Sequence, residues 1–302
     1  MIGRWGKAAL AAAAALLPGC AAVVPPATAP VPRVEVPPPA APVAPVALQP
    51  IRWTGRAIQG GLVSGVAPAG TQSLALNGKA VPVAPDGRFI IGFDRDAGPA
   101  ATLIATVGDG RTTRVAFSVA PRAWDISRLP TLPKVPVPQP EFAARRPGEL
   151  AQIVAARAMR TDAAGWAQLF RWPTTGRIST LFGSQRIYAN GEAGSYHSGI
   201  DIARATGTPV QAPADGVVIL AAAAPFTLEG NLLMIDHGMG LNSAFLHLSR
   251  INVSVGEHVS QGQVIGQVGA TGRATGPHLH WSLQWQGAKL DPLLAAGPMP
   301  GD

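Results

Sequence analysis

Residues 276–281, Gly276-Pro277-His278-Leu279-His280-Trp281, begin an alternation of polar and apolar residues that continues to Trp285. Successive side chains of a β-strand point to opposite faces of the sheet. One face of this predicted strand is therefore apolar, and the other carries His278, His280, Ser282 and Gln284. The apolar face predicts packing on a core. The two imidazoles on the opposite face are groups that bind metals or transfer protons.

A second candidate segment is Tyr196-His197-Ser198-Gly199-Ile200-Asp201, in which an imidazole and a carboxylate lie four residues apart. In a straight strand these two groups would be roughly 13 Å apart, whereas zinc holds its donor atoms at about 2.0–2.2 Å. The segment must therefore bend if both groups bind one metal ion. Gly199 is a suitable place for the bend, since glycine adopts backbone angles that other residues avoid.

A third imidazole, His247, lies in the predicted strand Ala244-Phe245-Leu246-His247-Leu248-Ser249. Simple alternation places Leu246 and Leu248 on the face opposite His247. Two histidines and one aspartate would form a three-ligand site with an open fourth position, which is typical of catalytic rather than structural zinc. The two remaining histidines would then be available for acid–base or oxyanion chemistry.

The order of these motifs resembles that of the lysostaphin-like (LytM-type) zinc metallopeptidases, which cut the peptide part of bacterial cell walls. The similarity covers roughly residues 173–294 and comprises His-x-x-x-Asp, Phe-Leu-His-Leu and Thr-Gly-Pro-His-Leu-His. It also includes the segments Gly207–Pro213, Ile235–Gly238 and Gly269–Gly272. Ser282 is a departure, because many members have glutamate there.

The resemblance implies one zinc ion per chain, with His197, Asp201 and His280 as its ligands. It implies that His247 and His278 act on the attacking water and on the transition state. The residues themselves leave the roles of His278 and His280 exchangeable, because both point to one face of the strand. No His-Glu-x-x-His helix is present to supply a carboxylate base.

The other two histidines have simpler interpretations. His237 follows an apolar strand in Asp-His-Gly, and His258 lies in Gly-Glu-His-Val. Both surroundings are typical of turns. We expect both imidazoles to be solvated turn residues without a role in the site.

The start of the chain predicts export. Arg4 and Lys7 precede an Ala/Leu-rich run that ends in Leu17-Pro18-Gly19-Cys20, which is typical of a signal peptide over 1–19. Cys20 is the only cysteine and lies where a bacterial lipoprotein is cut and acylated, although Pro18 is atypical. Simple secretion is the alternative. Residues 20–50 are rich in proline and alanine and predict an extended tether between an acyl anchor in the membrane and the rest of the chain.

The fold class predicted for the remaining chain is mainly β. Residues 51–125 alternate in strands such as Arg114–Val119 and contain turn signals such as Asn77-Gly78, which predicts a small β-sandwich. We interpret this region as a positioning or binding module. The alternative is a structural spacer. Residues 126–172 are expected to form a Pro-rich linker and one amphipathic helix, with Pro147 in the first turn. Leu150, Ile153, Val154 and Arg157 would form the stripe that packs on the next domain.

Residues 173–295 are expected to form the zinc peptidase domain, an antiparallel β fold of the duplicated hybrid motif type with no further helix. The net charge of +7 is not clustered in runs, which argues against nucleic acid as a partner. Protein partners stay unknown from the sequence. A moderately positive surface suits a substrate that carries carboxylates, such as peptidoglycan.

The resemblance therefore predicts a zinc endopeptidase of peptidoglycan cross-links. The alternative is a catalytically silent murein-binding activator of other wall hydrolases, although all five site positions are filled here. Ala21 after Cys20 resembles the signal for outer-membrane delivery. The expected location is therefore the periplasmic side of a Gram-negative envelope, and a D,D-endopeptidase is the expected activity.

Overall fold

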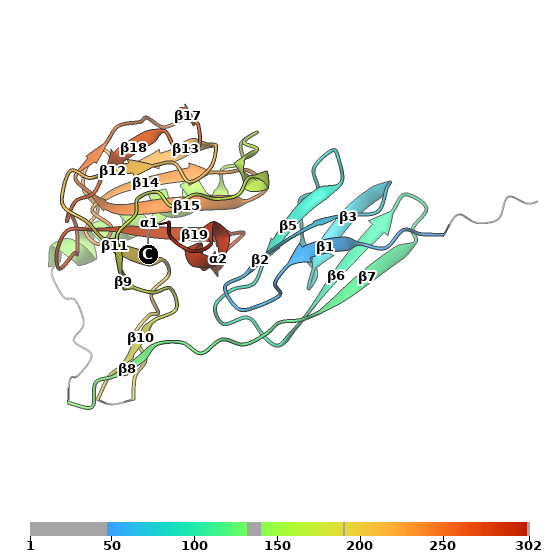
Figure 1. Ribbon diagram of the computed structural model, residues 1–302, viewed down its shortest axis with the longest axis horizontal. Helices are drawn as coiled ribbons and strands as arrows, with labels where there is room; N and C mark the ends of the chain where they lie inside the picture. Colours follow the sequence, from blue (N-terminus) through green and yellow to red (C-terminus); the bar gives the residue numbers. More distant parts are fainter. Residues whose placement is uncertain (1–46, 132–139, 190, 301–302) are drawn as a thin grey trace, which may run out of the picture. The chain divides into compact units, whose positions relative to one another are not determined.

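The computed structural model describes residues 47–131, 140–189 and 191–300 of the protein. The predicted signal peptide 1–19, Cys20 and most of the 20–50 tether lie outside the described residues, as does most of the Pro-rich stretch 129–140. The described residues are mainly β, which confirms the predicted fold class (Figure 1). Neither of the helices in the described part combines the length and the apolar character needed to cross a bilayer.

The first β region consists of two antiparallel sheets. A three-stranded sheet has the order β1-β2-β5, and a four-stranded sheet has the order β4-β3-β6-β7. Their strands are β1 (Arg52–Gly55), β2 (Leu62–Val66), β3 (Thr71–Leu76), β4 (Lys79–Ala80), β5 (Arg88–Gly92), β6 (Ala100–Val107) and β7 (Thr112–Ser118). Phe89, Leu103 and Phe117 are buried between the sheets. The expected turn at Asn77-Gly78 joins β3 to β4, and both residues have positive φ, as a type I′ turn requires.

Helix α1 (Pro140–Ala158) differs from the prediction in two ways. The helix begins at Pro140, which therefore occupies the first turn, where a missing N–H costs nothing. Pro147 lies inside the helix and not in its first turn. The buried face contains Glu149, Ile153 and Ala156, whereas Leu150 and Val154 are 44% and 65% exposed. The prediction is therefore correct for Ile153 and wrong for Leu150 and Val154, because Glu149 on the packed face binds Thr227.

The second β region contains the sheet that carries the polar motifs. Within the described residues it has eight strands in the order β17-β13-β14-β15-β19-β11-β9, with β20 paired to β19 (Figure 1). The strands are β9 (Arg177–Thr180), β11 (Ile200–Ala203), β13 (Gly216–Ala221), β14 (Asn231–Asp236), β15 (Leu241–Leu248), β17 (His258–Val259), β19 (His278–Trp285) and β20 (Ala288–Leu290). All the pairs in this sheet are antiparallel.

Smaller elements complete the fold. A three-stranded sheet has the order β12-β18-β16, and β8 and β10 form a parallel pair. Their bounds are β8 (Ile126–Arg128), β10 (Gln185–Ile187), β12 (Pro209–Gln211), β16 (Arg250–Ile251) and β18 (Val264–Gln267), and a 3-10 turn spans Gly165–Ala167. Helix α2 (Pro292–Ala296) was not predicted. It is a single short turn that begins because Asp291 accepts a hydrogen bond from the backbone N–H of Leu293.

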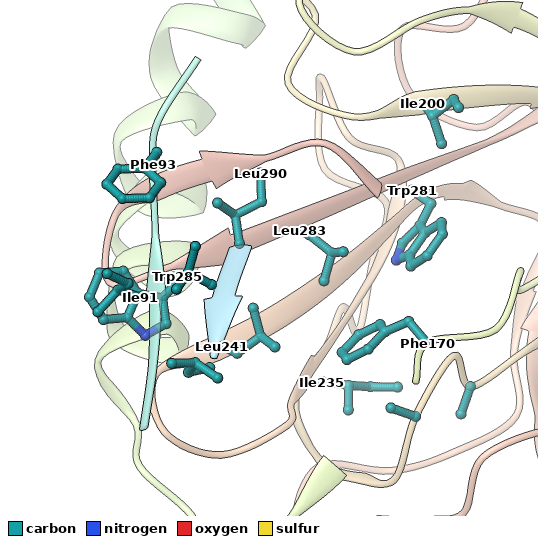
Figure 2. Close-up of a cluster of buried hydrophobic side chains, with 14 of the residues drawn as sticks. Ile91, Phe93, Phe170, Ile200, Ile235, Leu241, Trp281, Leu283, Trp285 and Leu290 are labelled. Carbon is teal, nitrogen blue, oxygen red and sulfur yellow. The ribbon is translucent and has the colours of Figure 1, made fainter. Parts of the chain in front are cut away.

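A continuous apolar core links β5 to the large sheet. Figure 2 shows Ile91 and Phe93 beside Trp285 and Leu290, and all four side chains are buried. Gly92 permits this contact, because a Cβ there would lie 2.8 Å from a methyl group of Leu290. The first β region is therefore packed directly on the strands that carry the imidazole motif.

Candidate metal centre

Three predicted residues bring donor atoms to one point. Nε2 of His197 lies 3.0 Å from Oδ1 of Asp201 and 3.0 Å from Nδ1 of His280, and Nδ1 of His280 lies 2.9 Å from the same carboxylate oxygen. Asp201 and His280 face each other directly across β11 and β19. The trio contains His280 and not His278, whose Nε2 lies 3.8 Å from the carboxylate. The geometry thus separates two histidines that strand alternation leaves equivalent.

The expected bend between His197 and Asp201 is present. β11 begins only at Ile200, and His197 precedes it in a loop whose backbone pairs with Gly183 and Ser184. Gly199 is required here mainly for space, because a Cβ would lie 2.4 Å from the carbonyl oxygen of Trp281 and 2.7 Å from Nε2 of His280. The absence of a side chain thus lets the loop fold over His280.

The chemistry of this donor set fits a zinc ion. Nδ1 of His197 donates its hydrogen to the Leu181 carbonyl at 3.0 Å, which leaves Nε2 with a lone pair that points at the carboxylate. Burial by itself would raise the pKa of Asp201, but the neighbouring imidazoles of His197 and His280 hold that pKa well below its usual range. Two nitrogen donors and one ionised oxygen about 3 Å apart match three corners of a tetrahedral zinc site.

His247 reaches the same site through a break in the strand pattern. Its φ is +63°, and the register of β14 with β15 shifts there, so that one residue of β14, Leu232, opposes two of β15, Leu246 and His247. This is a β-bulge, which re-aims side chains near functional sites. The predicted alternation was therefore wrong here, since Leu246 packs with the cluster under α1 and Leu248 belongs to the core on the other face.

Both non-trio imidazoles have a defined tautomer. Nδ1 of His247 donates to the Thr271 carbonyl, and Nδ1 of His278 donates to the Gly276 carbonyl, each at 2.8 Å. Their rings lie 4.8 Å apart between centroids. Burial lowers the pKa of His247 to about 4, and the nearby imidazoles act in the same direction. His247 is therefore neutral at pH 7, and its Nε2 can accept a proton.

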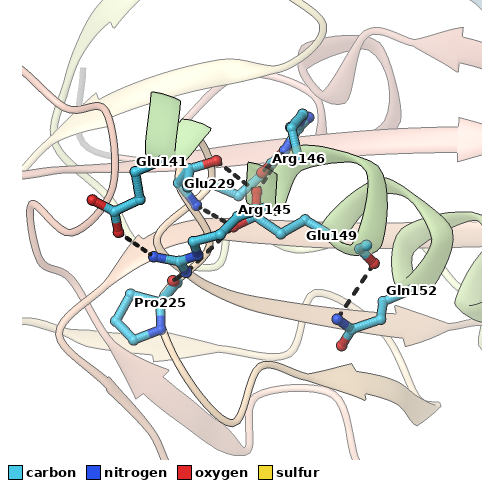
Figure 3. A network of polar contacts seen from close by, with 9 residues as sticks. Glu141, Arg145, Arg146, Glu149, Gln152, Pro225 and Glu229 are labelled. Carbon is cyan, nitrogen blue, oxygen red and sulfur yellow. Dashed lines mark hydrogen bonds and ion pairs between the residues drawn. The ribbon is translucent and has the colours of Figure 1, made fainter. Parts of the chain in front are cut away.

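Helix α1 holds the loop that supports His247. The backbone N–H of His247 donates to the carbonyl of Glu229 at 2.8 Å. The Glu229 carboxylate accepts two hydrogen bonds from the Arg146 guanidinium, at 2.6 and 2.8 Å (Figure 3). Glu149 of the same helix accepts hydrogen bonds from the backbone and the hydroxyl of Thr227. This polar network, which the sequence did not reveal, connects the helix to a site residue through one loop.

The first β region contacts the loop that contains His197. Arg95 is 7% exposed, and its guanidinium donates to the carbonyl of Gly183 at 3.0 Å. The same guanidinium lies over the ring of Tyr196, whose hydroxyl donates to Asp94 at 3.2 Å. Tyr196 directly precedes His197. Residues of 51–125 therefore support the position of one of the three donors.

Of the two predictions for the remaining histidines, the one for His258 is correct and the one for His237 is wrong. His258 is exposed at the start of β17, as expected for a residue outside the site. His237 is completely buried, not solvated. Its Nδ1 donates to the Asp215 carbonyl at 2.8 Å, and its Nε2 accepts from the Ser243 hydroxyl at 2.7 Å. Ser243 in turn accepts from the indole of Trp281, so this core imidazole has both nitrogens satisfied.

The comparisons with known proteins agree with this geometry. Residues 195–292 match the model of Peptidase family M23. The chain is 42% identical over 123 residues to the peptidoglycan DD-endopeptidase ShyA of Vibrio cholerae, and 41% identical over 124 residues to the DD-carboxypeptidase/endopeptidase Mpg of Neisseria meningitidis. Each match covers 41% of this chain, and the chain spans only 28% of the length of either relative.

A crystal structure of a putative M23 peptidase from Pseudomonas aeruginosa is similar over a much larger part of the chain. The alignment covers 80% of this chain and 96% of that one, with a TM-score of 0.62 and 30% sequence identity. The similarity therefore extends beyond the segment matched by the family model. With the donor trio, the two further imidazoles and this shared architecture in place, the chain belongs to peptidase family M23.

Proposed function

We propose that the protein is a zinc-dependent endopeptidase that hydrolyses the peptide cross-links of bacterial peptidoglycan. The observation that carries the proposal is the convergence of His197, Asp201 and His280 with the rings of His247 and His278 beside them. Peptidoglycan as the substrate is supported by the names of the relatives from Vibrio and Neisseria.

The roles within the site follow from the donor atoms. His197, Asp201 and His280 would hold the metal. When bound, zinc polarises a peptide carbonyl and lowers the pKa of a water towards 7. His247 and His278 each present a bare Nε2, because each commits its Nδ1 hydrogen to a backbone carbonyl. Each can therefore accept a proton from the attacking water and return it to the leaving amine.

The proposed bond is the D,D cross-link of Gram-negative murein. Digestion of purified murein containing D-Ala–diaminopimelate cross-links, beside murein with pentaglycine bridges, tests this assignment. We expect chromatography to show cross-link fragments from the first substrate only. Preference for pentaglycine would overturn the bond assignment but leave the peptidase proposal intact.

The alternative of a catalytically silent murein-binding activator is tested by the same digestion. None of the five site positions carries a residue unsuited to its proposed role, and no observation favours loss of activity. Binding to murein without released fragments, in a preparation that contains stoichiometric zinc, would favour the activator.

The proposal includes a domain assignment. Residues 51–125 serve as a positioning module for the peptidase domain 173–295, with 126–172 as the connection between them. Support comes from the contact of Arg95 with Gly183 and from the packing of Ile91 and Phe93 beside Trp285.

The proposed location is the periplasmic side of the outer membrane, with an acyl anchor on Cys20. Cells grown with radiolabelled palmitate should label the wild-type protein and leave Cys20→Ala unlabelled. A cleaved, unlabelled wild-type protein would instead support simple secretion.

A further inference from the structure

A basic pocket lies apart from the metal centre. Its volume is about 340 Å³, and its lining includes the cationic side chains of Lys79, Arg157 and Arg160 and the polar residues Asn242 and Gln286. Lys79 is the first residue of β4, Arg157 lies at the C-terminal end of α1, and Arg160 follows that helix. The lining contains no carboxylate.

The three cations are not neutralised by neighbouring acids. Lys79 donates to the carbonyl of Gln286, and Arg160 donates to the carbonyls of Arg157 and Met159. Within the described residues, none of the three forms an ion pair. Burial lowers the pKa of Arg157, and the charge of Glu229 only partly offsets this effect. Glu229 itself is already held by Arg146.

An unsatisfied polar atom in the pocket points to a ligand. Nε of Arg157 is buried and has no hydrogen-bond partner among the residues that the structure describes. Buried polar groups are nearly always hydrogen-bonded in folded proteins. Asn242, which is 6% exposed, places a side-chain amide in the same pocket. An amide beside guanidinium and ammonium groups matches an anion with several acceptor oxygens.

The pocket shares a sheet face with the metal centre. Asn242 pairs directly with Gln284 across β15 and β19, and Gln284 and His280 lie on the same side of β19 because they are four residues apart. This spacing corresponds to about 13 Å along the strand, or about four residues of an extended peptide. Ser282, which is uncharged, lies between them.

We infer that this pocket binds a free carboxylate of the peptidoglycan peptide whose cross-link is held at His280. The inference rests on the proposed function, and it adds a subsite that selects substrates by charge about four residues from the scissile bond. A bound carboxylate would accept hydrogen bonds from Asn242 and Arg157 and would neutralise part of the charge of Lys79 and Arg160.

The test uses the full chain and two forms of insoluble murein, one native and one with its carboxylates chemically amidated. The variant Lys79→Gln with Arg160→Gln removes two pocket charges at exposed positions. The matched control, Arg52→Gln with Arg114→Gln, removes two exposed charges from β1 and β7. Thermal melting of each protein verifies that it is folded.

Sedimentation with native murein should show about 10-fold weaker binding for the pocket variant, the scale expected for two lost ion pairs. Amidated murein should bind wild type and pocket variant equally. In hydrolysis of native murein, KM should rise by a similar factor and kcat should change little. The control variant should bind native murein like the wild type.

Several outcomes would overturn the inference. Equal binding of native and amidated murein by the wild type would exclude carboxylate recognition. An equal loss in the control variant would show a general charge effect. Loss of binding to phosphatidylglycerol vesicles, with murein affinity intact, would assign the pocket to a lipid phosphate. If the wild type hydrolysed no murein but bound it in a carboxylate-dependent way through the pocket, the proposed function would fail and the subsite would stand.

Discussion

His237 and His280 are both buried in the second β region, yet their surroundings differ completely. Each nitrogen of His237 meets a partner of the opposite kind, a carbonyl for its N–H and a hydroxyl for its lone pair. Nδ1 of His280 instead meets a carboxylate oxygen and the nitrogen of another imidazole. A buried histidine with complementary partners stabilises a core, whereas one whose nitrogen faces two other potential metal donors is suited to bind a cation.

The largest difference should appear when one residue of each kind is removed. His280→Ala should lose stoichiometric zinc and all activity, because two remaining donors cannot hold the ion tightly. His197→Ala and Asp201→Ala should behave alike. His237→Ala should keep its zinc, provided that the variant folds. Metal analysis after dialysis measures this, and a wild-type protein without stoichiometric zinc would contradict the whole assignment of the centre.

The second prediction distinguishes the three donor residues from the neighbouring His247 and His278. His247→Ala and His278→Ala should keep zinc, while turnover falls by about 100-fold or more, the scale of a lost acid–base or oxyanion group. Hydrolysis of murein and metal content are measured on the same preparations. Loss of zinc from His278→Ala together with its retention in His280→Ala would exchange the roles of these two residues.

The buried imidazole of His237 should affect how the free energy of unfolding depends on pH. Burial lowers the pKa of His237 to about 4, below the value of about 6.5 in an unfolded chain. Between these values the unfolded chain binds more protons than the folded one. The contribution of His237 to the free energy of unfolding should therefore fall by about 2–3 kcal/mol as pH falls from 7 to 4.

Urea unfolding at several pH values measures this loss of stability. His237→Gln should reduce the pH dependence by that amount, since the variant lacks the titrating group. His258→Ala is the matched control at an exposed position and should leave the pH dependence unchanged. An identical pH profile for His237→Gln and wild type would show that His237 does not titrate in this range.

A smaller effect is expected from the polar network of α1. Glu229→Gln weakens the pairing with Arg146 and leaves the backbone contact to His247 dependent on the loop alone. We expect kcat to fall by about 10-fold, the order of one lost charge-assisted contact, with KM and zinc content unchanged. Glu141→Gln, which changes an exposed carboxylate of the same helix, is the matched control. A change in KM without a change in kcat would argue against a role in positioning His247.

Much of the site could be predicted from the local sequence, because its residues lie in short motifs. The alternation from His278 to Trp285 predicted β19 with its apolar face inward, and the structure confirms it. The need to bring His197 to Asp201 predicted a bend at Ser198-Gly199, which the structure also shows. Strand period and donor spacing are local properties, so they can be read without knowing the fold.

Tertiary structure decided everything that depends on distant partners. The choice of His280 over His278 depends on the register of β19 with β11, and the direction of His247 depends on a bulge against β14. His237 is buried because Ser243 and the Asp215 carbonyl satisfy it, and the buried face of α1 follows from Thr227 and Glu229. In each case the local pattern allows more than one arrangement, and contacts made by residues remote in sequence select one of them.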